Sequence, residues 1–445
     1  MLTSESTAFM KLADVFGSGM VLQRNKKITV FGEGDGKGSI EFCGNTVEFE
    51  SENGAFRAYL PEMEAGGPYT MTVTLNGKTE VLTDILVGDV YIAGGQSNMQ
   101  VQVWETLDIQ PRVCDGVRYF LEGHDAHKYY LGEEYYTKNE WQYATVESSK
   151  NFSAVAFEFA VQLSQRSGVA IGIIECCHGS SRIDAWTAPE IVNTEEYLSI
   201  FPEKKVEPYP FNNDSWLYTN KLLPLAPLSV SGVIFYQGES NSRFSEADNY
   251  GKYFEYMVNN WRQIFDDPAM PFYTVQIMAF HQPESGACWA GVRAQQEWAS
   301  KNIENVYLVT IMNTGEGKLI HPRRKKCVGE ALAKAVMNTK YGEDIEYCGP
   351  IHEKIEEIES GIKVTFSHAD GLHFKGNCPD GIFVYHQNGN PDIVDTEIEG
   401  NVLTIRWRSS WSVSRVTMGY ENYPHHNLYN SSGYLASPFK YIPES

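Results

Sequence analysis

The sequence predicts an α/β protein in which a parallel β-sheet, with helices on both faces, is flanked by two β segments. Residues 27–85 and 343–445 contain short runs that alternate apolar and polar positions between Gly and Asn turns. Such alternation is typical of antiparallel strands. Between these two segments, short apolar runs alternate with longer stretches of helical periodicity. Strands that alternate with helices predict a parallel sheet covered on both sides. The predicted domains are therefore a β domain over 1–86, an α/β domain over 87–342 and a second β domain over 343–445.

The predicted central strands are short apolar runs with almost no charge. They are VYIAG, VAIGIIECC, VSGVIFY, PFYTVQI and VYLVTI, all within the predicted α/β domain. Uninterrupted apolar runs of this kind are typical of parallel strands that are buried on both faces. Active sites of such sheets lie beyond the carboxyl ends of the strands, so the residues that follow these runs are the first candidates for function.

Three stretches predict helices, because apolar residues recur along one face of each. They are residues 153–165, 245–265 and 322–337. We expect Pro322 at the first position of the third helix, where the missing N–H costs nothing. Residues 101–150 are rich in Tyr and charge, and we expect them to form an irregular insertion near the site.

The composition is that of a folded, acidic protein. Hydrophobic residues make up 42% of the 445 residues, charged residues 21%, and the net charge is −21. Nucleic acid and anionic membrane surfaces are poor partners for this charge, so neither is expected. No apolar run is long enough to span a membrane, and residues 1–20 lack the basic and apolar segments of a secretion signal. We therefore expect a cytoplasmic protein.

Cysteine and histidine spacing does not indicate a metal centre. The eight cysteines are scattered along the chain without disulfide or zinc spacing, so free thiols are expected. His124 and His127 are three residues apart, but no further ligand cluster accompanies them. Neither a metal nor a cofactor is expected.

The segment GDVYIAGGQSNMQ runs from a predicted strand through two glycines to Ser97. Glycines permit a sharp turn, and a helix that begins there would present the Ser97 hydroxyl at the carboxyl edge of the sheet. The general nucleophile elbow, G-x-S-x-G, does not fit, because Met99 holds its second Gly position. A serine that merely caps a helix explains the segment equally well.

Three further segments place polar residues beside a strand end or a helix start. Gly179 follows the strand in GIIECCHGSSRIDAW, either with its N–H in a cleft or as part of an ordinary turn. Gln237, Glu239 and Asn241 follow the strand in GVIFYQGESN, where amide side chains suit the stabilisation of an oxyanion. His321, in LIHPRRKKCVGEALA, precedes a predicted helix, and a histidine taken alone is more often structural.

Together these segments resemble the SGNH hydrolases, and among them the sialate O-acetylesterase-like carbohydrate esterases. GQSNM is similar to the nucleophile block, YQGESN to the third block and IHPRRKKCVGEALA to the block of the catalytic histidine. VFGSGMVLQR and NLYNSSGYLASPF resemble the family's N- and C-terminal signatures, so the resemblance covers essentially the whole chain. It implies an SGNH, flavodoxin-like parallel sheet flanked by β-sandwich-type segments.

The resemblance also implies roles for the matching residues. The protein would be a cofactor-free serine esterase that hydrolyses acetyl esters on sugars. Ser97 would attack the acetyl carbonyl, while His321 would take the Ser97 proton and return it to the leaving sugar hydroxyl. The oxyanion would be bound by the N–H groups of Ser97 and Gly179 and by one side-chain amide, that of Gln237 in preference to Asn241.

One position departs from the family pattern. Many relatives carry an Asp three residues before the catalytic histidine, and this chain has Lys318, which cannot accept an imidazole proton. Three alternatives follow: a Ser–His dyad in which a backbone carbonyl orients His321, substitution by Glu316, or loss of activity. We prefer the dyad, because removal of the Asp usually lowers the rate less than removal of the Ser or His.

The substrate is expected to be an acetylated mono- or oligosaccharide. Arg182, Trp186 and Glu239 are the candidates for binding it. Packing explains Trp186 equally well, and a surface ion pair is the commoner role for Arg182. Two other functions remain open. One is a catalytically impaired carbohydrate-binding protein, which the missing Asp favours, and the other is an esterase for short non-sugar acyl esters.

Overall fold

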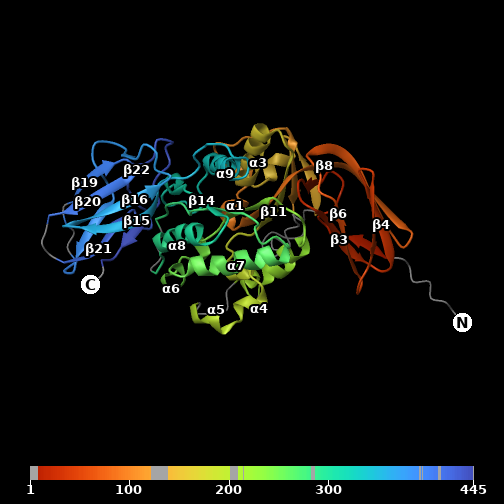
Figure 1. Ribbon diagram of the computed structural model, residues 1–445, viewed down its shortest axis with the longest axis horizontal. Coiled ribbons are helices and arrows are strands. Elements are labelled where there is room, and N and C mark those ends of the chain that lie inside the picture. Colours follow the sequence, from red (N-terminus) through yellow and green to blue (C-terminus); the bar gives the residue numbers. More distant parts are fainter. Residues whose placement is uncertain are drawn as a thin grey trace.

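The computed structural model describes residues 9–121, 139–200, 209–213, 215–281, 286–389, 392, 394–408 and 412–443. A parallel sheet with helices on both faces lies between two β regions, one at each end of the elongated molecule (Figure 1). In this part of the chain no helix combines the length and the apolar character needed to cross a membrane. The α/β class predicted from the sequence is confirmed.

The central sheet has the strand order β9-β11-β8-β12-β13-β14, and every neighbouring pair in it is parallel. The bounds are β8 Lys78–Gly95, β9 Cys114–Leu121, β11 Ile171–Cys177, β12 Gly232–Tyr236, β13 Phe272–Val275 and β14 Val306–Val309. All five apolar runs predicted as central strands are present. Strands β9 and β11 lie on one side of β8, and β12, β13 and β14 lie on the other. The chain therefore changes direction across the sheet at β8, and the topological switch point lies at the carboxyl end of this strand.

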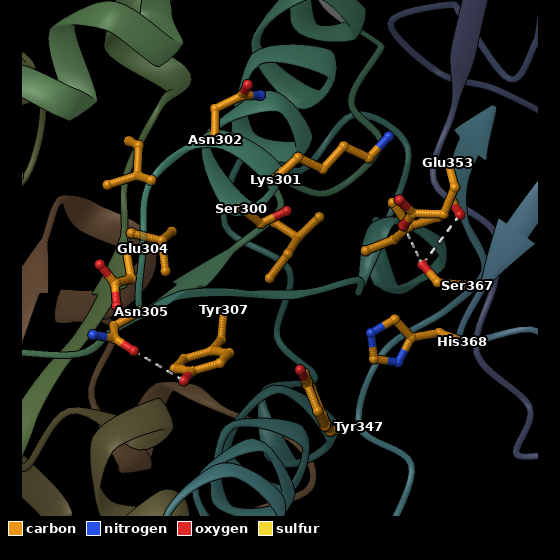
Figure 2. Close-up of a pocket in the computed structure, with 14 residues that line it drawn as sticks. Ser300, Lys301, Asn302, Glu304, Asn305, Tyr307, Tyr347, Glu353, Ser367 and His368 are labelled. Atoms are coloured by element: carbon orange, nitrogen blue, oxygen red, sulfur yellow. Dashed lines mark hydrogen bonds between the residues drawn. The ribbon is translucent and has the colours of Figure 1, made fainter.

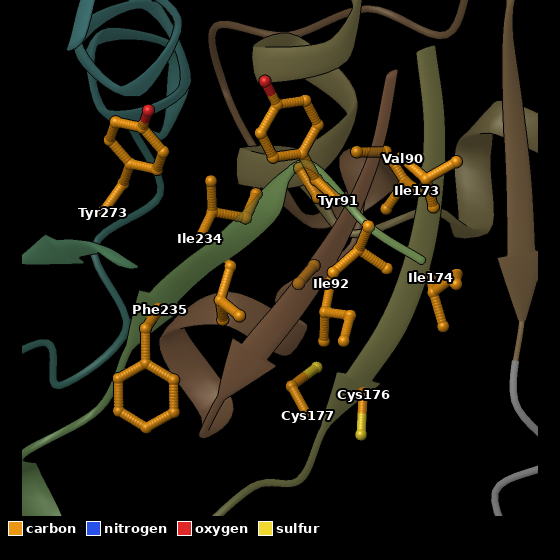
Figure 3. Packing of buried hydrophobic residues seen from close by; sticks show 14 of the residues in the cluster. Val90, Tyr91, Ile92, Ile173, Ile174, Cys176, Cys177, Ile234, Phe235 and Tyr273 are labelled. Atoms are coloured by element: carbon orange, nitrogen blue, oxygen red, sulfur yellow. The ribbon is translucent and has the colours of Figure 1, made fainter. Parts of the chain in front are cut away.

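Apolar side chains of neighbouring strands interlock to form the core of this sheet. On one face of the sheet Tyr91 on β8 lies beside Ile173 on β11, and on the other face Ile92 on β8 lies beside Ile174 on β11. All four are fully buried (Figure 3). Burial on both faces explains why these strands are continuous apolar runs rather than alternating ones.

Two pairs of helices cover the two faces of the sheet. Helix α3 (Ala154–Ser167) packs against α9 (Lys326–Thr339) on one face, and α7 (Tyr250–Ile264) packs against α8 (Trp289–Asn302) on the other (Figure 1). Shorter helices are α1 Ser97–Gln100, α4 Pro189–Val192, α5 Glu195–Ile200 and α6 Phe244–Ala247. The hydroxyl of Ser153 accepts a hydrogen bond from the Ala156 N–H and caps α3, as a helix start at 153 requires.

Two helix predictions need correction. The helix predicted over 245–265 is divided into α6 and α7, because the backbone of Asn249 is not helical. The third helix begins at Lys326 rather than at Pro322. Residues 323–326 donate their backbone N–H groups to the carboxylates of Glu316 and Asp108, which hold this stretch as a turn.

The prediction of an irregular insertion over 101–150 is wrong for two of its described stretches, while residues 101–113 and 145–150 are irregular apart from short 3-10 turns. Residues 114–121 form β9, a parallel strand of the central sheet, and β10 (Glu140–Ala144) pairs antiparallel with it at the edge. The turn η1 (Val103–Glu105) follows α1.

The N-terminal β region continues into the central sheet without a linker. Its strands are β1 Met10–Leu12, β2 Val21–Gln23, β3 Ile28–Gly34, β4 Lys37–Phe42, β5 Asn45–Glu50, β6 Ala55–Leu60 and β7 Gly66–Leu75. Strand β8 pairs with β7 over its first half and with β11 and β12 over its second. The predicted boundary at residue 86 thus falls inside one strand, and the hydrophobic core is continuous across it.

The C-terminal β region has a core of its own. Its strands are β15 Ile351–Ile358, β16 Gly361–Ser367, β17 His373–Phe374, β18 Ile382–His386, β19 Val394–Glu399, β20 Val402–Trp407, β21 Val413–Met418, β22 Leu428–Tyr429 and β23 Phe439–Tyr441. The sheets β15-β16-β20-β19 and β18-β21-β23 contribute to one buried cluster, which includes Val364, Leu403, Val384 and Val416. Two sheets that share one core form a β-sandwich-type unit.

Candidate active site

Ser97 lies at the carboxyl end of the central strand, where the topological switch point is found. Strand β8 ends at Gly95, and Ser97 is the first residue of α1. Gly95 has φ +126°, and a Cβ there would overlap the backbone oxygen of Tyr236 on β12, so only glycine fits. The N–H groups of Ser97 and Asn98 start a helix and therefore have no acceptor within it.

The backbone of Gly179 lies directly against Ser97. A Cβ at position 179 would be 3.6 Å from the Ser97 Cβ and 3.1 Å from Oε1 of Gln100, so a side chain here would crowd the serine. The Gly179 N–H donates to Gln100 Oε1 at 2.8 Å. The N–H group that the family resemblance assigns to the oxyanion hole is thus hydrogen-bonded to a side-chain oxygen in this structure.

The side chain of Asn98 connects three segments beneath Ser97. Its Nδ2 donates to Glu239 Oε1 at 2.6 Å and to the Ile320 carbonyl at 3.0 Å. Its Oδ1 accepts a hydrogen bond from Lys325 Nζ at 2.5 Å. Asn98 is fully buried and Glu239 and Lys325 nearly so, and a polar network of this kind holds its members in one arrangement.

This network joins the turn that holds the predicted nucleophile to the turn that holds the predicted base. Ser97 directly precedes Asn98, and His321 directly follows Ile320, whose carbonyl accepts the Asn98 amide. The turn after β8 and the turn before α9 are therefore joined one residue away from each catalytic candidate.

The imidazole of His321 has no hydrogen-bond acceptor among the residues that the structure describes. Glu316, one sequence candidate for orienting it, instead accepts the N–H groups of Arg323 and Arg324 through Oε1, at 2.9 and 3.3 Å. Lys318 is exposed. Neither Glu316 nor a backbone carbonyl therefore orients the ring in this structure, and catalytic hydrogen bonds of free enzymes often form only with substrate bound.

Electrostatics favour the neutral, proton-accepting form of His321. Partial burial lowers the pKa of His321, the Lys325 ammonium lowers it further, and the Glu105 carboxylate partly opposes both. Burial also lowers the pKa of Lys325 to about 8, and it raises the pKa of Glu239 despite the hydrogen bond from Asn98.

A pH profile tests this arrangement. We expect the ascending limb of kcat/KM, which reports the base of the free enzyme, to have its midpoint below about 6.5. Lys325→Gln should move the midpoint upward, because removal of a nearby cation makes protonation of the imidazole easier. The matched control is Lys326→Gln, which removes an exposed lysine at the start of α9. An unchanged midpoint in Lys325→Gln would mean that Lys325 does not lower the pKa of His321, whatever the maximum value of kcat/KM.

The structure does not support a side-chain amide from the third segment as an oxyanion donor. Gln237 Nε2 donates to the Ser181 carbonyl at 3.1 Å and to Asn241 Oδ1 at 2.9 Å, which uses both of its hydrogens. Asn241 Nδ2 donates to Glu246 Oε2 at 3.3 Å. Both amides are fully buried, and they join the turns after β11 and β12 rather than facing a substrate.

The substrate-binding candidates also have other partners. Arg182 is neither exposed nor in a surface ion pair: it is buried, with Nη2 3.1 Å from Glu246 Oε2 and Nε 3.2 Å from Asp184 Oδ1. Trp186 is fully buried, and its indole N–H donates to Ser181 Oγ at 2.9 Å. Glu239 is buried against Asn98. These three side chains are buried and engaged with protein partners.

A cavity elsewhere in the molecule is not a competing active site. It has a volume of about 470 Å³ and lies between the end of α8, the start of β14 and the C-terminal β region (Figure 2). Its polar groups bind one another, as Ser367 Oγ does with Glu353 Oε1 at 2.5 Å. It borders the amino end of β14, whereas Ser97 lies at the opposite, carboxyl edge of the sheet.

No group of three or more His, Cys, Asp or Glu side chains within the described ranges is placed to hold a metal ion. His124 and His127 lie outside the described residues. All eight cysteines are free thiols, as expected.

Sequence reasoning missed three residues that the structure places at the site: Asn98, Gln100 and Lys325. Each lies inside a segment already singled out, since Asn98 and Gln100 follow Ser97 and Lys325 follows His321 by four residues. Their place in these segments was the one sign in the sequence of a role at the site. Their contacts could not be predicted, because a partner such as Ile320 is more than 200 residues from Asn98 along the chain.

Comparisons with known proteins agree with one another. Residues 87–338 match the sequence profile of a family described as carbohydrate esterase, sialic acid-specific acetylesterase. Over 333 residues, the chain is 25% identical to the sialate O-acetylesterases of Pongo abelii and Homo sapiens, which covers 67% of this chain and 63% of each of those proteins. The chain thus spans less than two thirds of their length. A crystal structure of a carbohydrate acetylesterase from Xanthomonas citri is similar with a TM-score of 0.84 and 26% identity, over 97% of this chain and 99% of that one.

Proposed function

Because this chain belongs to the sialic acid-specific acetylesterase family of carbohydrate esterases, we propose that it hydrolyses acetyl esters on sugars through Ser97 and His321. The observation that carries the proposal is the Asn98 amide, which joins the turn of Ser97 to the turn of His321. The proposal includes an SGNH-type sheet. The order of β11, β8, β12, β13 and β14 supports it, since these five strands are arranged 2-1-3-4-5 in chain order, as in flavodoxin-like sheets, when the additional strand β9 beside β11 is set aside.

In the proposed reaction Ser97 Oγ attacks the acetyl carbonyl, and His321 accepts the hydroxyl proton. The lowered pKa of His321 keeps its ring neutral and able to accept that proton. His321 then protonates the leaving sugar oxygen. Water, deprotonated by the same imidazole, attacks the acetyl-enzyme. The imidazolium then returns this proton to Ser97 Oγ as the ester bond breaks, which releases acetic acid and free Ser97.

The negative charge on the carbonyl oxygen is proposed to be stabilised by backbone N–H groups alone. The Ser97 N–H starts α1, and the Gly179 N–H lies against Ser97 and donates to Gln100 Oε1 in the free protein. The substrate's oxyanion would displace the side-chain oxygen Oε1 of Gln100 and gain a donor that is already aligned. This proposal replaces Gln237 and Asn241, whose amides have other partners.

The proposed machinery is a dyad rather than a triad. Lys318 stands at the family's Asp position, and Glu316 caps the turn after His321. The Asn98–Ile320 hydrogen bond would hold the histidine turn in place of a carboxylate orienter.

Acetate release from a panel of esters tests the function. The panel contains 9-O-acetyl-N-acetylneuraminic acid, acetylated xylan, acetylated mannan, acetylated pectin and ethyl acetate, with butyryl esters as the acyl-length control. We expect acetate from at least one sugar ester, at a higher kcat/KM than for ethyl acetate. If no acetate were released from any ester, the proposed esterase activity would be wrong and a carbohydrate-binding protein would be favoured. Hydrolysis of ethyl acetate and butyryl esters alone would favour an esterase for non-sugar substrates.

A further inference from the structure

An exposed apolar surface flanks the histidine turn. Four of the fourteen large apolar side chains that are exposed in the described chain lie on two short segments, 103–108 and 316–326. They are Trp104, Leu107, Leu319 and Ile320. Trp104 is 62% exposed, the highest exposed fraction among the fourteen.

The two segments are held together by backbone and side-chain hydrogen bonds. The Leu107 N–H donates to the Arg323 carbonyl at 2.9 Å, and Arg323 Nε donates to the Glu105 carbonyl at 3.3 Å. The Asp108 carboxylate accepts the N–H of Lys325 at 3.0 Å. Trp104 is therefore carried on a segment fastened to the turn that holds His321.

Trp104 lies close to Ser97 along the chain and directly precedes a residue whose charge acts on His321. It follows Ser97 by seven residues, and the carboxylate of its neighbour Glu105 acts on the imidazole of His321. These relations place the indole beside the proposed ester site rather than in a separate region.

The ring of Trp104 is held in place although it is exposed. Its indole N–H donates to Gln102 Oε1 at 2.6 Å. The backbone N–H of Gln102 in turn donates to Glu105 Oε2 at 2.8 Å, which holds this residue in place. A large flat side chain with an oriented plane binds a ring at low entropic cost, because little freedom is left to lose.

We propose that Trp104 is the stacking platform for a sugar ring of the substrate, and that it selects carbohydrate esters over simple esters. This inference rests on the proposed function and adds its specificity determinant. One face of a pyranose ring carries mainly C–H groups, which suit the face of an indole, while its hydroxyls stay in water. Leu107, Leu319 and Ile320 extend the apolar surface around the platform.

The test compares Trp104→Ala and Trp104→Phe with the wild type, using the sugar ester hydrolysed fastest in the panel and ethyl acetate. We expect Trp104→Ala to raise KM for the sugar ester roughly 3- to 10-fold with little change in kcat, and Trp104→Phe to restore most of the affinity. Kinetics on ethyl acetate should change less than about 2-fold, because that ester has no ring to stack. The matched control is Ile442→Ala, an apolar residue of 61% exposure in the C-terminal β region.

The outcomes separate the platform from the esterase itself. Three results for Trp104→Ala would contradict the stacking role but not the esterase activity. They are an equal loss of kcat/KM on both esters, a loss in kcat alone, and an unchanged KM for the sugar ester. A wild type that hydrolyses ethyl acetate but no sugar ester would overturn it as well. A wild type inactive on all esters would overturn the proposed function together with the inference that rests on it.

Discussion

Ser97→Ala is expected to lower kcat on the best sugar ester by about 10³- to 10⁶-fold and to leave the fold unchanged. The hydroxyl is the proposed nucleophile, and its position between Gly95 and Asn98 is determined by backbone contacts that alanine keeps. The measurement is acetate release under saturating substrate, together with a circular dichroism spectrum and a melting temperature for each variant.

His321→Ala should cause a loss of similar size, and the double variant should be little worse than either single one. Groups that act as one unit are strongly non-additive, since removal of either leaves nothing for the other to do. Additive losses would mean that Ser97 and His321 act separately, which contradicts the proposed proton transfer.

Ser240→Ala is the matched control for loss of a hydroxyl. Ser240 lies in the turn after β12. Among the described residues its hydroxyl has no hydrogen-bond partner, and its backbone N–H donates to Gln96 Oε1 at 3.1 Å, a contact that alanine preserves. We expect this variant to keep wild-type activity. If Ser97→Ala also kept it, Ser97 would merely start a helix.

Asp89→Ala is expected to lower the free energy of unfolding by about 3–5 kcal/mol, the largest effect on stability that we expect from a single substitution. Asp89 is fully buried on β8, at the end of the sheet opposite Ser97. Its carboxylate accepts hydrogen bonds from the side chains of Gln23, Arg24, Ser231, Lys340 and Tyr341. Removal of the carboxylate leaves the partly buried cations of Arg24 and Lys340 and the hydroxyls of Ser231 and Tyr341 without their shared acceptor.

The same site predicts a pH dependence of stability. Burial alone would raise the pKa of Asp89, but hydrogen bonds and charge from Arg24 and Lys340 bring that pKa well below its usual range. A carboxylate with a depressed folded-state pKa stabilises the fold above its unfolded pKa of about 3.9, and this contribution is lost as the pH falls further. The difference between wild type and Asp89→Ala should therefore be constant above about pH 5 and should shrink below about pH 4.

Asp395→Ala is the matched control in urea or thermal unfolding at several pH values. Asp395 pairs with Arg408 at 2.7 Å, but both side chains are exposed, so little change in stability is expected. If Asp89→Ala cost no more than Asp395→Ala, the buried cluster would not stabilise the junction between the N-terminal β region and the central sheet.

Local patterns predicted elements well where burial alone determines them. Strands β8 and β11–β14 were predictable, because a strand covered on both faces needs a continuous apolar run. Strand β9 was missed because Arg118 interrupts its apolar run. The guanidinium of Arg118 donates to the Asp115 carbonyl at 2.7 Å and pairs with the Asp84 carboxylate at 3.7 Å. The second contact is with a residue far away along the chain, which the local sequence does not reveal.

The start of α9 shows the same limit for a helix. Pro322 is a good first helical residue on local grounds. The carboxylate of Asp108, far away along the chain, binds the N–H groups of residues 325 and 326 and sets the start there instead.

The sequence by itself determined the α/β class, the strands that form the centre of the sheet, and the turns that hold Ser97, Gly179 and His321. These features depend on apolar periodicity and on glycines at strand ends, which are local properties. Only the tertiary structure decided which polar side chains are available to a substrate. Gln237 and Arg182 are bound to partners from other segments and Trp186 is fully buried, while Trp104 is left exposed beside the histidine turn. The reason is physical: a buried polar group must find a partner, and the partner is supplied by whichever segment the fold brings to it.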